Sequence, residues 1–233
     1  MLKGCAFVVA CAALAAQGAS GFSVDGTIGD AEWAAAESRF GLCPRNSQEQ
    51  FPAEAEALAA RDSERLYVAV RSAIPASGLL RRVMPNRQGA YAYIDDAVTL
   101  ALPGRRGLVV NANGAVTATG WEPKDLKCAS TVTNGFWNFE MSLPLSEVGE
   151  VDKFDVGRRW ATADKAYGRT TSASFDMASV SSASPRVRML GIASANAAYT
   201  VRMRVHNPSG KAVEVKVEAS GRPENSQPAV LRK

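Results

Sequence analysis

The sequence predicts an all-β protein: a jelly-roll-like β-sandwich followed by a C-terminal β-hairpin appendage. Short segments of apolar or alternating character recur along the chain and are separated by Gly, Pro and Asn-Gly pairs, which is typical of sandwich strands and their turns. Two Asn-Gly pairs, at residues 113–114 and 134–135, each separate two strand-like runs. No segment carries a long helical period that would compete with this interpretation.

The first 20 residues contain the three parts of a secretory signal peptide. Lys3 gives a positive start, residues 6–16 form an apolar run, and small residues follow at 17–21. The run is shorter than the about 20 apolar residues that a membrane-spanning helix needs, and no other stretch reaches that length. We therefore expect a signal peptide over residues 1–20 and a secreted, cell-surface or periplasmic protein. The alternatives are a buried core helix, or lipidation of Cys11 at the end of a Val-Val-Ala-Cys segment.

Removal of the signal leaves roughly 210 residues, enough for one sandwich domain and a short appendage. We expect the sandwich over residues 22–193. Residues 194–233 then form either an appendage that packs on it or the start of a further β-domain of a larger surface protein. The chain has 27 Lys and Arg against 23 Asp and Glu, scattered along its length. This pattern lacks the clustered basic face of nucleic-acid-binding proteins, so we expect no nucleic-acid partner.

Two cysteines remain after the signal, Cys43 and Cys128. In an exported protein they could form a disulfide bond. The alternative is that both are small apolar residues of the interior.

The first half of the chain contains several strand-like segments. Residues 23–28 alternate and end at Gly29-Asp30, and residues 30–33 begin a helical turn that Asp30 caps. Residues 75–89 read as a loop. The remaining strands of this half are predicted at residues 55–60 and 66–70, which form a hairpin, and at residues 97–102.

The Asn-Gly pairs predict two hairpins, over residues 108–119 and 127–143. A two-residue turn at 134–135 places Thr133 opposite Phe136, and counting outward places Cys128 opposite Met141 on the apolar face. On the other face Glu140 lies opposite Ala129. We expect a structural carboxylate with a local hydrogen-bond partner there, and the alternative is an acid that faces a ligand.

The second half is less regular. Two further sandwich strands are predicted at residues 159–164 and 187–192, with a long exposed loop rich in Ser, Ala and Thr over residues 170–185. A linker at 193–198 leads to a hairpin whose strands, at residues 199–205 and 212–218, flank a turn at 207–210.

Few residues offer catalytic chemistry. His206 is the only histidine and lies beside a turn, so neither a nucleophile–histidine site nor a common zinc site is available. The acids that could form a glycoside-hydrolase pair are Asp95, Asp96, Glu122 and Glu140. We interpret Asp95 and Asp96 as a strand-entry turn, with calcium as the metal that their oxygens would hold. We therefore expect no enzyme activity.

Aromatic residues are more informative, because sugars are bound largely by flat rings with a few polar groups around them. We expect Trp137 and Trp160 in the core, and Trp33 as a staple between the first turn and the sandwich. Trp121 follows a hairpin and Tyr91 and Tyr93 precede a strand, so we expect these three to be exposed. Trp121 and Tyr93 are the candidates for a ligand platform.

Several segments resemble, in order, the family 9 carbohydrate-binding modules and their wider DOMON-like relatives. The match covers residues 22–193 and its best segment is FWNFEMSLPLSEVG, an aromatic-x-x-acid-x-x-x-proline strand that runs into a helical turn. The other segments are VDGTIGDAEWAAA, ERLYVAVRS, IDDAVTLAL, NANGAV, VGRRWATAD and RMLGI. The resemblance implies a β-sandwich that binds carbohydrate without catalysis.

The resemblance also implies site residues. The family's central strand looks like W-x-x-D-x-x-E, and aligned on Asp96 this chain has Tyr93 in place of the tryptophan and Thr99 in place of the glutamate. A second stacking aromatic falls at Phe175. The predicted ligand set is therefore Tyr93, Asp96, Thr99, Trp121 and Phe175.

The expected function is a secreted, non-catalytic module that recognises a glycan or polysaccharide, in carbohydrate breakdown or cell-surface attachment. One alternative is a structural or interaction module of a larger extracellular protein, with no sugar site. Another is a haem-binding DOMON relative, for which Met84 or Met177 would be an axial ligand.

Overall fold

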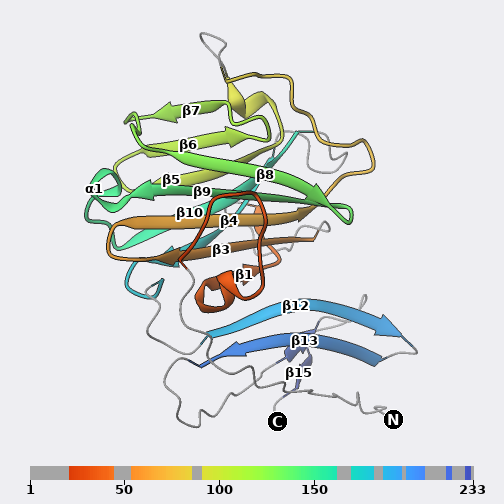
Figure 1. Ribbon diagram of the computed structural model, residues 1–233. Helices are drawn as coiled ribbons and strands as arrows, with labels where there is room; N and C mark the ends of the chain where they lie inside the picture. Colours follow the sequence, from red (N-terminus) through yellow and green to blue (C-terminus); the bar gives the residue numbers. More distant parts are fainter. Residues whose placement is uncertain are drawn as a thin grey trace.

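The structure is a computed structural model that describes residues 21–44, 54–85, 91–161, 169–180, 186–195, 198–207, 219–221 and 229–231. The predicted signal peptide lies outside these residues. Two antiparallel sheets pack face to face, and a separate two-stranded hairpin lies below them in Figure 1. The predicted all-β sandwich is confirmed.

The five-stranded sheet has the order β1-β3-β4-β9-β8, and all its neighbours are antiparallel. In that order its strands are β1 (Glu37–Phe40), β3 (Ala55–Arg61), β4 (Arg65–Ala73), β9 (Phe136–Pro144) and β8 (Lys127–Thr133).

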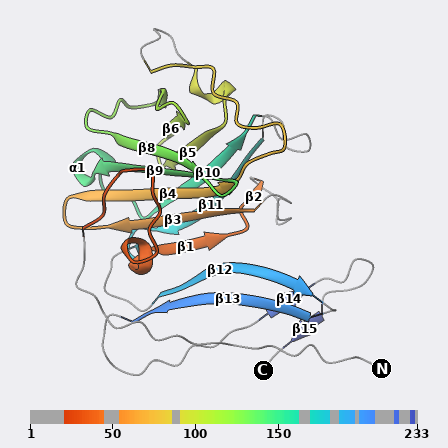
Figure 2. The same ribbon diagram turned by 45° about the vertical axis from the view of Figure 1, so that its right-hand side comes forward.

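The six-stranded sheet, the second layer, has the order β2-β11-β10-β5-β6-β7 and is also antiparallel throughout. Its strands are β2 (Cys43–Pro44), β11 (Arg169–Asp176), β10 (Lys153–Trp160), β5 (Ala97–Leu102), β6 (Arg106–Asn111) and β7 (Val116–Thr119). Short helical turns connect strands: η1 (Glu32–Ala35), η2 (Ala92–Ile94) and α1 (Leu145–Val148). The turned view in Figure 2 separates this sheet from the first.

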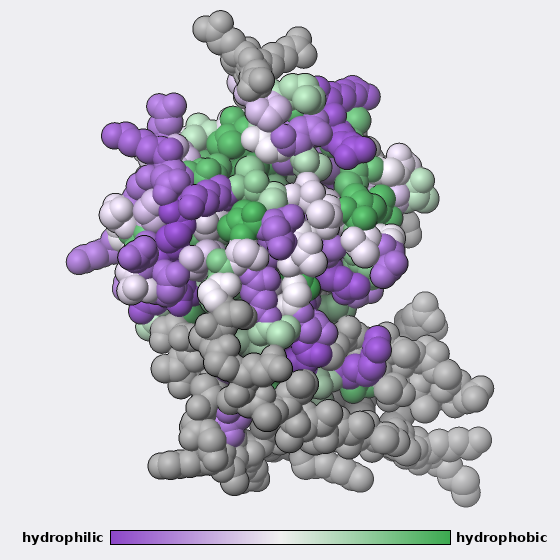
Figure 3. Space-filling model, in the orientation of Figure 1, coloured by the Kyte–Doolittle hydropathy of each residue, from purple (hydrophilic) through white to green (hydrophobic). Residues whose placement is uncertain are grey.

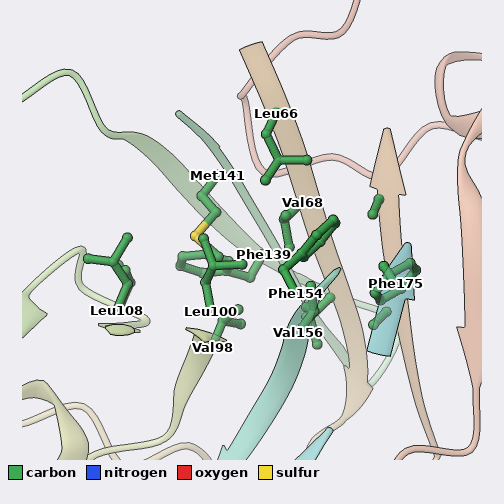
Figure 4. Packing of buried hydrophobic residues seen from close by; sticks show 14 of the residues in the cluster. Leu66, Val68, Val98, Leu100, Leu108, Phe139, Met141, Phe154, Val156 and Phe175 are labelled. Carbon is green, nitrogen blue, oxygen red and sulfur yellow. The ribbon is translucent and has the colours of Figure 1, made fainter. Parts of the chain in front are cut away.

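The core lies between the sheets and is built from every second residue of each strand. The close-up in Figure 4 shows side chains of both sheets meeting there. Trp137 and Trp160 are fully buried, as predicted. Trp33 is buried against the outer face of β3 and β4, so the predicted staple is also confirmed.

The two Asn-Gly hairpins differ in their turns. Asn134 and Gly135 both have positive φ, and Thr133 lies opposite Phe136, so the predicted register of β8 and β9 is confirmed. At the first hairpin only Gly114 has positive φ, and Asn111 rather than Ala112 is bonded to Ala115. The Asn111 side chain explains this longer turn, because its oxygen accepts the N–H groups of residues 113 and 115.

Two segments differ from their prediction. Residues 23–28 form no strand, because Gly26 has a φ of 85° and the backbone donors here bond to carboxylates. We call residues 22–33 the N-terminal strap. Residues 169–176 form β11 rather than an exposed loop: Thr171 and Phe175 point inward and are buried, while Ser174 and Asp176 face outward.

The C-terminal part is arranged differently from the prediction. Residues 187–192 belong to β12 (Arg186–Ala195), which pairs with β13 (Ala198–His206) and not with a sandwich strand. The expected boundary at residue 193 thus falls inside β12. The described residues of the expected linker, 193–195 and 198, belong to β12 and β13. Two short strands follow, β14 (Ala219–Gly221) and β15 (Ala229–Leu231). The strand predicted at residues 212–218 lies outside the described residues.

The hairpin of β12 and β13 is attached to the sandwich by buried charges. Arg188 donates from Nε and Nη2 to the two oxygens of Glu56 on β3, at 2.8 and 3.0 Å. Asp30 lies 3.5 Å from Arg188 and accepts a hydrogen bond from Arg204 at 2.8 Å. Such paired charges anchor the appendage at one edge of the sandwich.

The predicted disulfide between Cys43 and Cys128 is wrong, because Cys128 is a free thiol. Its sulfur lies beside Gly114, in the hairpin of β6 and β7, whereas Cys43 lies on β2 at the opposite edge of the six-stranded sheet. From β2 to β6 there are four inter-strand spacings, about 19 Å in total. A disulfide needs Cα atoms within about 7 Å. Cys128 instead packs partly against the core, and burial raises the pKa of its thiol.

Candidate functional site

Glu140 has the structural role that its position on β9 predicts. One carboxylate oxygen accepts the backbone N–H groups of Asp25 and Gly26, at 3.0 and 2.8 Å, and the other accepts Nε1–H of Trp33 at 2.8 Å. The side chain is fully buried under the N-terminal strap. Burial raises the pKa of Glu140 above its ordinary value, although these N–H donors act in the opposite direction. Glu140 therefore faces no ligand.

Asp96 is also fully buried, at the entry to β5. Its carboxylate accepts N–H groups of Leu80 at 2.7 Å and Ala161 at 3.1 Å, and lies 2.8 Å from Nη2 of Arg158. Three donors thus occupy the oxygens that a sugar or a cation would need. The prediction that Asp96 contacts a ligand or calcium is therefore wrong, and Asp96 fixes the residues before it instead.

Asp95 completes this anchorage. One of its oxygens accepts the N–H of Val83 and the side-chain amide of Asn111, both at 2.8 Å, and the carboxylate is fully buried. No group of three or more His, Cys, Asp and Glu side chains within the described ranges could hold a metal ion. Asp96 is therefore wrong as a calcium ligand, whereas calcium binding at Asp95, whose Oδ1 is buried without a hydrogen-bond partner in these ranges, stays a prediction.

Arg158 on β10 is the buried partner that the sequence analysis missed. Its guanidinium lies between two tryptophan rings, 4.6 Å from the centroid of Trp137 and 4.4 Å from that of Trp160, and Nε donates to Ser72. Burial lowers its pKa to about 10, and the charge of Asp96 acts against that shift. The sequence does indicate this position. Arg158 and Trp160 are two residues apart in β10, and strand alternation puts them on the same face, so a buried Trp160 implies an inward-facing Arg158.

These buried contacts hold a turn that presents two tyrosines to solvent, as predicted. Tyr91 directly precedes η2 and Tyr93 lies within it, and the two residues are 57% and 44% exposed. Their ring centroids lie 5.4 Å apart at an interplanar angle of 58°. The backbone between them is fixed by a hydrogen bond from the N–H of Ala92 to the Thr117 hydroxyl. We call Tyr91, Tyr93 and the exposed Ile94 the tyrosine turn.

The tyrosine turn lies next to the outer face of the six-stranded sheet. Arg159 of β10 donates from Nε to the carbonyl of Tyr93, and its guanidinium lies 6.0 Å from the Tyr93 ring centroid. Thr99 lies on the same face, paired with Gly157, and is half-buried. A side chain at Gly157 would lie 2.6 Å from the Thr99 hydroxyl, so only glycine leaves that hydroxyl in place. The role of Thr99 in binding stays a prediction.

Trp121 lies at a different place, in a groove between the edge strands β7 and β8. The cavity has a volume of about 540 Å³ and combines apolar walls with charged side chains; it is lined by Gly114, Val116, Ala118, Trp121, Glu122, Pro123, Lys124, Leu126 and Cys128. Trp121 is only partly exposed and packs against the core, with Arg106 5.8 Å from its ring centroid. The structure therefore does not bring Trp121 together with the tyrosine turn.

Phe175 is wrong as a ligand-stacking residue. It is 1% exposed and stacks on Phe154, with ring centroids 5.6 Å apart, inside the core. The cause is strand alternation in β11, which the sequence analysis had taken for a loop.

Among the residues that the structure describes, the groups needed for hydrolysis or haem binding are also not assembled into a site. Glu140 and the pair Asp95 and Asp96 are committed to the contacts above, and Glu122 is exposed in the Trp121 groove. Met177 is buried after β11, Met84 is exposed on the loop before η2, and His206 ends β13.

Comparisons with known proteins find similarity in structure only. No family model matches the sequence, and no curated protein matches it. A family 9 carbohydrate-binding module from Caldicellulosiruptor kristjanssonii in complex with cellotriose is 16% identical, with a TM-score of 0.46 over 66% of this chain and 80% of that chain. A family 9 module from the same organism in complex with glucose is 15% identical, with a TM-score of 0.48 over 66% of this chain and 82% of that one.

Across the described ranges, no helix is long and apolar enough to cross a membrane.

Proposed function

We propose that this protein is a secreted, non-catalytic carbohydrate-binding module that holds a glycan or polysaccharide on the tyrosine turn. The observation that carries the proposal is the pair of exposed tyrosine rings, 5.4 Å apart, on a backbone held by buried hydrogen bonds. Flat rings on a rigid support bind sugar faces with little loss of side-chain entropy.

Polar groups of the right kind surround the rings. Arg159 is bonded to the Tyr93 backbone, and Thr99 follows two residues beyond Ala97 on the same outer face. Hydroxyl and guanidinium groups beside an aromatic ring provide the donors and acceptors that fix the orientation of a sugar. The ordered motifs of the sequence support this proposal, and the similar modules are complexes with cellotriose and glucose.

The biological role follows from the predicted signal peptide. An exported module without chemistry of its own would keep a partner domain or a cell surface attached to carbohydrate. We propose this attachment, in polysaccharide breakdown or at the cell surface, as the role of the chain.

The test is a screen of the purified chain against soluble glycans and insoluble polysaccharides, repeated with Tyr91→Ala and Tyr93→Ala. We expect binding to weaken about tenfold or more in each variant, as for a ring at the centre of an interface. Val132→Ala is the matched control, because Val132 is exposed on β8 of the other sheet. A chelator should leave the affinity unchanged.

Two outcomes would overturn the proposal. One is the absence of binding to every carbohydrate by a folded protein, which would favour the structural or interaction module. The other is binding that survives both tyrosine substitutions and is lost in Trp121→Ala, which would move the site to the Trp121 groove.

A further inference from the structure

The end of the sandwich that carries the tyrosine turn is also rich in exposed arginine. Arg81 and Arg82 are exposed on the segment that runs beside Asp95 and Asp96, and Arg159 lies against Tyr93. The loop segment is fixed from both sides. Leu80 exchanges hydrogen bonds with Asp96 through its N–H and its carbonyl, at 2.7 and 2.9 Å.

The next residues of this segment are fixed too. The carbonyl of Arg81 accepts a hydrogen bond from the Asn113 side chain at 3.0 Å, and the N–H of Val83 donates to Asp95. Arg81 and Arg82 therefore project from a backbone that is held next to the tyrosine turn.

The acids that the structure describes at this end do not neutralise Arg81 or Arg82. Asp95 and Asp96 are fully buried, and Arg158 pairs with Asp96 inside the core. Glu54 is partly exposed but pairs with Arg71 at 3.6 Å. In the part of the chain that the structure describes, neither Arg81 nor Arg82 has an ion-pair partner.

The opposite end of the strands has a different charge balance. Figure 3 shows hydrophilic residues gathered on the side that carries α1 in Figure 1. There, exposed acids accompany the basic residues, among them Asp62, Glu64, Glu150 and Asp152. Within the described ranges, the end of the sandwich that carries the tyrosine turn therefore differs from the opposite end, because its exposed arginines are not accompanied by unpaired exposed acids.

We propose that the tyrosine turn binds an acidic glycan, one that carries carboxylate or sulfate groups, with Arg81 and Arg82 paired to those groups. This inference rests on the proposed carbohydrate-binding function and names its substrate class. The rings bind the sugar face, and the planar guanidinium groups match the paired oxygens of a carboxylate or sulfate. A neutral glycan would leave the charges of Arg81 and Arg82 without a partner.

The test compares polymers at low and at high salt by titration calorimetry. The carboxylate arm uses polygalacturonate and alginate, the sulfate arm uses chondroitin sulfate, and the neutral arm uses xylan and glucomannan. Polyglutamate is the polyanion that lacks sugar. We expect the acidic glycans of at least one arm to bind about tenfold or more tightly than the neutral ones, with a preference that salt weakens.

Variants that replace arginine by uncharged glutamine test which residues cause the preference for acidic glycans. We expect Arg81→Gln and Arg82→Gln together to lower the affinity for the acidic glycan about tenfold and to reduce its salt dependence. Arg105→Gln is the matched control, since Arg105 is exposed at the turn between β5 and β6, at the opposite end of the strands. Tyr93→Ala should weaken binding to the same polymer without changing its salt dependence.

The outcomes separate the two proposals. Equal, Tyr93-dependent binding of neutral and acidic glycans overturns the acidic preference and leaves the carbohydrate-binding function standing. No binding of any glycan overturns both. Binding of polyglutamate as tight as that of the acidic glycans, with no loss in Tyr93→Ala, shows attraction by charge alone and also overturns the inference.

Discussion

Two irregular segments of this protein, the N-terminal strap and the tyrosine turn, are each held to a sheet by a fully buried carboxylate. Glu140 holds the strap through neutral N–H donors from Asp25, Gly26 and Trp33. Asp96 holds the tyrosine turn through two N–H groups and the charged guanidinium of Arg158. One anchor is therefore a set of charge–dipole hydrogen bonds, and the other contains a buried ion pair.

The two anchored segments differ in whether they bury or expose their aromatic rings, and this difference indicates the role of each anchor. The strap covers apolar surface, where Phe22 and Trp33 pack on Tyr67, so its anchor serves the fold. The tyrosine turn exposes its rings instead of burying them, so its anchor pre-organises a surface. Removing one partner of a buried ion pair costs more than removing the acceptor of charge–dipole hydrogen bonds, so we expect loss of Asp96 to destabilise the protein more than loss of Glu140.

The largest effect is expected for Asp96→Ala. This change leaves the guanidinium of Arg158 buried between two tryptophan rings without its carboxylate, and removing one partner of a buried pair costs about 3–5 kcal/mol. Urea denaturation measures the loss. Asp155→Ala, on the outer face of β10, is the control and should change stability by about 0.5 kcal/mol or less. A loss below about 1 kcal/mol for Asp96→Ala would show that the pair does not hold the turn.

Glu140→Ala is expected to cost somewhat less. It leaves three N–H groups without their acceptor, a loss of about 2–4 kcal/mol because the strap can partly rehydrate. Hydrogen exchange should rise over residues 22–33 and stay unchanged at the tyrosine turn. Glu122→Ala, an exposed acid, should be neutral. Faster exchange at residues 91–96 in Glu140→Ala would contradict the independence of the two anchors.

Gly26→Ala sharpens the description of the strap. Gly26 has a φ of 85°, and a Cβ there would lie 2.9 Å from backbone atoms of Ser130. We expect a loss of about 2–3 kcal/mol from strain and close contact together. Gly135→Ala isolates the strain, because Gly135 has a φ of 77° and nothing within 4 Å of its Cβ position. Equal losses in the two variants, measured by urea denaturation, would show that the strap does not press on β8.

The sequence predicts much of this architecture where side-chain pattern and turn chemistry agree. The register of β8 and β9 follows from one Asn-Gly turn, and it assigns Glu140 to the face opposite the core. The prediction fails where a small-residue strand looks like a loop, as in β11, and that error placed Phe175 on the surface. The strand predicted at residues 23–28 fails for another reason. The apolar–polar pattern of these residues is typical of a strand, but the pattern does not show whether another strand lies beside them to pair with.

The candidate site is predicted in part for a similar reason. Tyr91 and Tyr93 stand out as aromatic residues before a strand, and both are exposed. The prediction that Asp96 contacts a ligand is wrong because a sequence motif gives the types of the residues and not how deeply each is buried. Its depth depends on Arg158, 62 residues away in the chain and adjacent only after β5 and β10 pair.

The smallest expected effect concerns pH: the contributions of Glu140 and Asp62 to the stability of the protein should change with pH in opposite directions. Burial raises the pKa of Glu140 above 4.5, so the folded protein binds this proton more tightly than the unfolded chain. Its contribution to stability is then fully present below 4.5 and declines as pH rises through the folded pKa. Burial also acts to raise the pKa of Asp62. The N–H groups of Glu64 and Arg65 and the Tyr67 hydroxyl outweigh it, so that pKa lies below 3.8.

Stability curves from about pH 3 to 7 should therefore separate the two acids. The difference in unfolding free energy between the unmodified protein and Glu140→Gln should fall as pH rises, because the cost of burying the ionised carboxylate grows. The corresponding difference for Asp62→Asn should vanish as pH falls through its lowered pKa. A difference for Glu140→Gln that instead grows with pH would mean that the three N–H bonds outweigh burial. The strap would then be held by charge as firmly as the tyrosine turn.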